Sequence, residues 1–139
     1  MLLSRMMSKQ NAILLKNPMV CMDLKTAVTS YQFAERAKSE LITCSQLSIA
    51  LTGFPEEEKA GGKRMLIHLY EAVRTELQFA VRSTGQSDFQ KAINSLNEAI
   101  SLVESNQPER ASEKIAAAIS ASTTTAQNAW QVLSEHGLI

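Results

Sequence analysis

Four long segments with few helix-breaking residues constrain this chain more than any other feature. They are separated by Gly53 with Pro55, by Gly85, and by the stretch ending at Pro108, and Gly137 follows the last one. Glycine accepts the left-handed conformation that ends many helices, and proline cannot continue a helix. This punctuation predicts four helices, over about residues 23–52, 63–84, 87–104 and 108–136.

Apolar side chains recur at steps of three and four residues within each segment, which is the spacing of one helix face. The third segment shows it most clearly, with Phe89, Ile93, Leu96, Ile100 and Val103. The first helix has a seam of small and apolar residues, and it also carries apolar residues off that seam. The off-seam residues are Phe33, Ile42, Leu47 and Ile49.

Local signals refine the helix ends. Asp23 is expected to cap the first helix, and Ser87 with Gln90 fits a capping box at the start of the third. Asn106 with Glu109 repeats a cap pattern before the fourth helix. The pair Gly61-Gly62 is expected to loosen or break any helical turn after Pro55, so the second helix is predicted to begin near Lys63.

Short connections between amphipathic helices favour antiparallel neighbours. We therefore predict an all-α fold, an antiparallel up-down four-helix bundle over residues 23–139. At 1.5 Å per residue the first helix is about 45 Å long and the third about 27 Å. Unless the Pro55 segment and the fourth helix cover the difference, apolar surface of the first helix is left for a partner, a second copy or the N-terminal arm.

Residues 1–22 form a separate, basic N-terminal arm in this interpretation. They hold Arg5, Lys9 and Lys16 and no acidic residue. A mobile arm, a start-site extension with Met22 as the true first residue, and a targeting peptide are all compatible with this sequence. The apolar run from Ala12 to Leu15 is too short for a secretory signal core.

Composition narrows the functional classes. Lys and Arg number 14 and Asp and Glu number 14, so no charge excess indicates a nucleic-acid partner. No apolar run approaches the length of about 18 residues that a membrane span needs. Cys21 and Cys44 form no CxxC motif, which favours two reduced thiols in a cytoplasmic protein.

The residues available for chemistry do not form a recognisable catalytic, cofactor or metal motif. Neither His68 nor His136 has a glutamate three residues before it, as a di-iron bundle requires. His68 with Glu71 has the reverse spacing, which is more typical of a surface histidine near a carboxylate. Gly62-Lys63 lacks the other residues of a phosphate loop. We therefore expect no enzyme, no cofactor and no metal site.

One stretch resembles a known family. Residues 65–73 read MLIHLYEAV, and Leu66, Ile67, Leu69, Tyr70 and Glu71 match a segment of the flagellin export chaperone (FliS) family. Asp88, Ala92, Leu96 and Ala99 match its next helix, and the similarity covers about residues 63–105. Gly61-Gly62 stands where the family has Ser-Pro, and a family helix rich in Tyr and Arg is missing. The segment from Ser87 to Leu102 also resembles one helix of a tetratricopeptide hairpin, without a 34-residue repeat.

The resemblance implies a non-enzymatic chaperone that holds an amphipathic segment of an exported client, such as flagellin, along grooves of the bundle. Candidate partner-binding residues are Tyr31, Phe33, Leu47, Leu66, Leu69 and Tyr70. The competing expectation is a self-associating structural or assembly bundle, in which the spare apolar surface forms a homodimer seam. Ordinary core packing is the alternative role for each of these residues.

Overall fold

The computed structural model describes residues 22–138, all but a few of them in four helices. Its elements are α2 (Leu24–Thr52), α3 (Glu56–Thr84), α4 (Ser87–Glu104) and α5 (Pro108–Glu135). No strand occurs within this part of the chain. The predicted arm, apart from Met22, lies outside the described residues.

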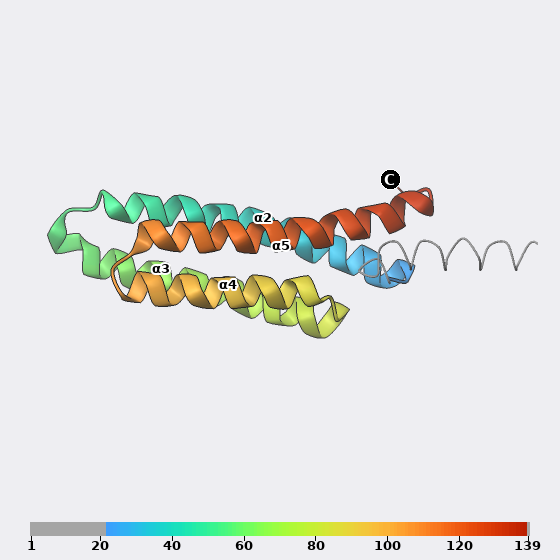
Figure 1. Cartoon of the computed structure of the whole chain (residues 1–139), viewed down its shortest axis with the longest axis horizontal. Helices are drawn as coiled ribbons and strands as arrows, with labels where there is room; N and C mark the ends of the chain where they lie inside the picture. Colours follow the sequence, from blue (N-terminus) through green and yellow to red (C-terminus); the bar gives the residue numbers. More distant parts are fainter. Residues whose placement is uncertain (1–21, 139) are drawn as a thin grey trace, which may run out of the picture.

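The four helices form an antiparallel up-down bundle, as predicted (Figure 1). Each helix packs against the helices before and after it in sequence, and α5 closes the ring by packing along α2. Across the diagonals, between α2 and α4 and between α3 and α5, the helix backbones do not come close, although side chains of α2 and α4 meet. The α2–α5 contact is the most extensive of the four, so the first and last helices form the largest interface within the bundle.

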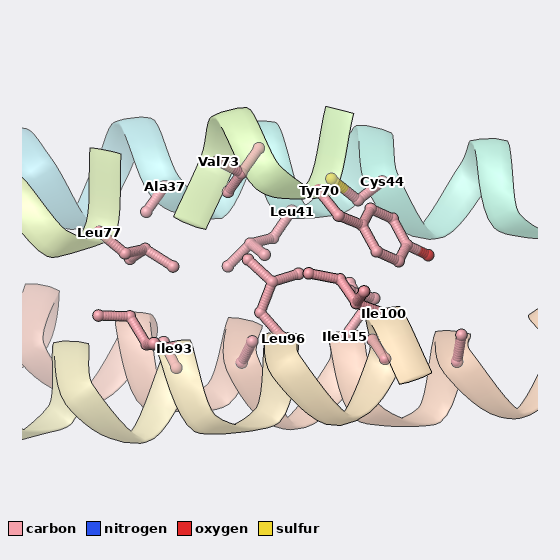
Figure 2. Close-up of a cluster of buried hydrophobic side chains, with 14 of the residues drawn as sticks. Ala37, Leu41, Cys44, Tyr70, Val73, Leu77, Ile93, Leu96, Ile100 and Ile115 are labelled. Carbon is pink, nitrogen blue, oxygen red and sulfur yellow. The ribbon is translucent and has the colours of Figure 1, made fainter. Parts of the chain in front are cut away.

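The core lies between the facing stripes of all four helices (Figure 2). Leu41, Leu77, Leu96 and Ile115 are almost completely buried there, one from each helix. Alanines fill much of the rest of the core, and small side chains let helix backbones approach closely. The hydroxyl of Tyr70 is buried in this core with the hydroxyl of Ser48, with which it forms a hydrogen bond.

Helices α2 and α5 extend beyond the other two at one end of the bundle (Figure 1). The ring of Phe33 packs edge-on against Phe89 near the start of α4, with ring centroids 6.4 Å apart. The part of α2 that precedes Phe33 has α5 as its neighbour, through a second buried cluster of Ala27, Ala129, Val132 and Leu133.

The predicted break at the glycine pair is wrong, because α3 runs without interruption from Glu56 to Thr84. Gly62 faces the turn after α2, where an added Cβ atom would lie 2.7 Å from Leu51 and from the ring of Phe54. Gly61 faces open space. Gly62 thus provides the room that the α2–α3 turn needs, and packing outweighs the low helix propensity of the pair.

The same substitution, glycine to alanine, is expected to have different effects on stability at positions 61 and 62. Gly61→Ala should raise the free energy of unfolding by about 0.5–1 kcal/mol, because alanine restricts the unfolded chain and meets no neighbour. Gly62→Ala should raise the free energy of unfolding by less than Gly61→Ala does, or lower it, because Leu51 and Phe54 must move to make room for the methyl group. Urea denaturation of both variants measures the difference, and equal stabilisation would contradict this role of Gly62.

The predicted caps have mixed outcomes. Asp23 caps α2 by accepting a 2.7 Å hydrogen bond from the backbone N–H of Thr26, as expected. The capping box at Ser87 is wrong, because Gln86 is the N-cap residue and makes no side-chain cap bond. The side chain of Gln90 instead donates to Asn94 within the helix. Asn106 is also not the cap of α5, which Gln107 precedes directly.

Asn106 has another role in the turn between α4 and α5. Its φ of 63° places it in the left-handed region, which asparagine tolerates better than most residues. Lys63 of α3 donates to the backbone oxygen of Glu104 at 2.7 Å and to the Asn106 side chain at 3.3 Å. One lysine therefore ties this turn to the first half of α3.

Candidate functional site

A second apolar stripe runs along α2, on a different side of the helix from its core stripe. At 100° per residue, Leu24, Tyr31, Ile42 and Ile49 share one side, and Val28 lies next to them. The core residues Ala34, Ala37, Leu41 and Cys44 lie on another side and are buried. In sequence order the side chains of the second stripe are Leu24, Val28, Tyr31, Glu35, Lys38, Ile42, Ser45 and Ile49.

We call these eight residues the α2 outer stripe. Four of its large apolar members are exposed: Leu24 and Val28 by 38% each, Ile42 by 46% and Ile49 by 57%. Tyr31 is partly buried. Single exposed apolar residues are ordinary on protein surfaces, but a series at regular helical spacing is what a partner helix recognises.

A shallow groove borders the stripe where α2 meets α5. Its volume is about 250 Å³, and Tyr31 of α2 and Trp130 of α5 line it. Trp130 is the single tryptophan of the chain and is 47% exposed. The ammonium of Lys38 and the carboxylate of Glu35 form an ion pair at 3.1 Å in the same groove. The groove therefore combines two aromatic rings with one charged pair. Such a combination is suited to contact with another protein.

The structure separates the six residues that the sequence suggested for partner binding. Leu66 and Tyr70 are buried in the core, and burial raises the pKa of the Tyr70 hydroxyl to about 12. Phe33 and Leu69 pack partly buried against that core. Leu47 is 47% exposed but lies away from the outer stripe on α2. Of the six, only Tyr31 belongs to the α2 outer stripe.

Leu24, Val28 and Trp130 contribute to this surface without having been predicted for it. Ile42 and Ile49 were recognised as apolar residues off the core seam, which is the signal that identifies a second stripe. The steps of three and four that connect Leu24 to Ile49 pass through Glu35, Lys38 and Ser45. Those polar residues hide the stripe from a search for apolar residues alone.

A charged cluster on the α2–α3 side is the main electrostatic feature elsewhere. Arg36 contacts both Glu40, at 3.2 Å, and Glu76, at 2.6 Å. The second carboxylate oxygen of Glu40 is buried and has no hydrogen-bond donor among the described residues. A proton on Glu76 would supply that donor, and this hydrogen bond with partial burial raises the pKa of Glu76 from 4.5 to about 7.

This shift predicts a pH-dependent stability. A carboxyl group with a raised pKa holds its proton longer in the folded state, so the fold loses stability as the pH rises from about 4.5 to about 7. Glu76→Gln should remove that part of the decline and stabilise the protein at pH 8. Thermal melts of both proteins between pH 4 and pH 8 test it, and parallel curves would contradict the shared proton.

A cavity of about 540 Å³ opens where the α2–α3 and α4–α5 turns meet, lined by Leu51 and Val103 and by the charged residues Glu56, Lys59 and Glu109. Lys63 also lines it, although its ammonium already binds the α4–α5 turn. Among residues 22–138, no group of three or more His, Cys, Asp or Glu side chains is placed to hold a metal ion.

No family model, no curated protein and no solved structure gives a significant match to the chain. Within the described part of the chain, none of the helices combines the length and apolar character of a membrane span.

Proposed function

We propose that this chain is a non-enzymatic helical binding protein whose contact surface is the α2 outer stripe with its bordering groove. The observation that carries the proposal is the regular exposure of Leu24, Val28, Ile42 and Ile49 on one long helix. These side chains lie outside both buried clusters of the bundle. Covering them with apolar surface would contribute about 25 cal/mol for each Å² removed from water.

An amphipathic helix is the ligand that this surface fits best. The stripe extends over most of α2 and has the spacing of a helix-in-groove contact. Tyr31 and Trp130 add aromatic rings, which are enriched at protein interfaces. The charged pair Glu35–Lys38 lies between the two apolar halves and would give a bound helix a preferred direction.

The resemblance to the flagellin export chaperones favours one version of this function. In that version, the bundle holds an amphipathic segment of a client such as flagellin until export. Tyr31 supports it, because this candidate client-binding residue belongs to the α2 outer stripe and is partly exposed. Leu66 and Tyr70 do not, because a client would reach them only in an opened bundle.

Site-specific photocrosslinking in the cells that make the protein tests the proposed surface. A photoreactive amino acid replaces Ile42 on the stripe or, as a control, Met65. Met65 is 71% exposed but lies on α3, away from the stripe. We expect an adduct with a second polypeptide from position 42 and little from position 65. Equal labelling from both positions, or none from either, would overturn the proposal.

A further inference from the structure

We propose that the occupant of the α2 outer stripe is a second copy of this chain, with the two α2 helices packed antiparallel about a two-fold axis. This inference rests on the proposed binding function and names its partner. Its basis is a symmetry within the stripe. Positions 24, 28, 31, 35, 38, 42, 45 and 49 follow alternating steps of four and three, which read the same from either end.

Antiparallel pairing about the midpoint between residues 36 and 37 brings apolar side chains together at two of its four kinds of contact and opposite charges together at a third. Position 24 then meets position 49 of the second copy, which pairs Leu24 with Ile49. Position 31 meets position 42, which pairs Tyr31 with Ile42. Val28 meets the small Ser45. Because a two-fold contact is isologous, every such pair occurs twice.

The central charges supply the complementarity that selects this arrangement. In the antiparallel register, Glu35 of one copy meets Lys38 of the other, and the reciprocal pair forms beside it. Within one chain these two side chains already lie 3.1 Å apart and are both partly exposed. The dimer would therefore have four alternating charges at its axis. A parallel pair in register would place Glu35 against Glu35 and Lys38 against Lys38, which is repulsive.

The size of the surface sets the expected affinity. Residues 24 to 49 cover about 37 Å of helix, and the groove at Trp130 widens the contact on the α5 side. One helix pair of this length lies toward the small end of specific interfaces. We therefore expect a reversible dimer with a dissociation constant of about 1–100 µM.

Charge reversal at the axis tests this arrangement on the full chain. Sedimentation equilibrium between about 1 and 300 µM should show a monomer–dimer equilibrium for the wild type. Glu35→Lys alone, or Lys38→Glu alone, brings like charges together at the axis and should weaken the dimer about tenfold at low salt. The double variant Glu35→Lys/Lys38→Glu restores opposite charges and should return to within about threefold of the wild type.

The outcomes separate this inference from the proposed function. A wild type that stays monomeric at every concentration, or a dimer that neither single reversal weakens, overturns the second copy as occupant. If position 42 still crosslinks to a different polypeptide, the binding function stands and its partner is a client helix. If the full-length protein is a monomer and removal of residues 1–21 makes it a dimer, the N-terminal segment covers the stripe in the full-length protein. The second copy is then not the occupant of the stripe in the full-length protein. Circular dichroism melts of each variant confirm that the monomer fold is intact.

Discussion

Replacing Phe89 with alanine is expected to cost about 3–5 kcal/mol of folding free energy, the largest loss predicted for any single side chain here. Phe89 is completely buried at the start of α4 and packs edge-on against Phe33 of α2. Its removal would leave a cavity at the level where α4 begins and α2 continues alone with α5. The thermal midpoint should fall by about 10–20 °C, since 1 kcal/mol shifts a domain of this size by several degrees.

Phe79→Ala is the matched control for this prediction. Phe79 is 52% exposed on α3, and the guanidinium of Arg82 lies 4.8 Å from its ring centroid. An exposed cation–π contact of this kind contributes about 0.5–1 kcal/mol. Urea denaturation of both variants compares the two phenylalanines directly. Similar losses at the two positions would contradict the complete burial of Phe89 against the core.

The second large effect is expected on association. Ile42→Glu places a carboxylate in the middle of the α2 outer stripe, opposite Tyr31 of the second copy in the proposed dimer. Because the substitution occurs twice in each dimer and buries charge against an apolar surface, the dissociation constant should rise at least about 100-fold. The free energy of unfolding of the monomer should change by less than about 0.5 kcal/mol, since residue 42 is exposed.

Met65→Glu provides the comparison for association. It adds the same charge at an exposed apolar position, on α3 and outside the stripe. Sedimentation equilibrium should therefore give a dissociation constant within about twofold of the wild type for this variant. An equal effect of both substitutions would mean that net charge, and not the stripe, controls association.

Much of the fold follows from local signals. Gly85 ends α3 in the left-handed conformation, as predicted, and Pro108 begins α5 at a position that tolerates proline. Gly53 also ends its helix, but with a φ of −92°, outside the left-handed region. The core face of each helix follows from its apolar spacing. Thr123 and Thr124 donate to backbone carbonyls one turn back, as hydroxyl residues within a helix often do. The buried hydroxyls of Ser122 and Thr125 in the same run have no such partner among the described residues.

The errors have a common physical origin in tertiary contact. Gly61-Gly62 predicted a break because helix propensity is a local quantity, whereas the close approach of Leu51 and Phe54 that favours glycine at position 62 arises only in the fold. The early start of α3, together with the length of α5, covers most of α2. The spare apolar surface is therefore smaller than helix lengths alone suggested. Apart from Leu47, the exposed large apolar residues of α2 lie along one side of the helix.

The candidate site was predictable only in part for a similar reason. Tyr70 and Leu66 belong to the most recognisable stretch of sequence, yet helix packing buries both. The sequence identifies Ile42 and Ile49 as surplus apolar residues, but the two neighbours that α2 acquires in the bundle decide which of its sides remain open. Trp130 joins the surface through the packing of α5 along α2, a contact between the two ends of the described chain.

Register-specific disulfide formation tests the central claim most directly, that the α2 outer stripe pairs with itself in antiparallel. In a Cys21→Ser background, Leu24→Cys and Ile49→Cys are combined in one chain. These positions lie about 37 Å apart along a single α2, so a disulfide between them must join two copies. Cys44 can remain, because it is buried and burial raises the pKa of its thiol to about 12.

Mild oxidation followed by non-reducing electrophoresis gives the readout. We expect the double variant to run as a covalent dimer in high yield, while each single variant and the shifted pair Leu24→Cys/Ile42→Cys remain largely monomeric. A double variant that stays monomeric, or crosslinks no better than the shifted pair, would contradict the proposed pairing of the stripe.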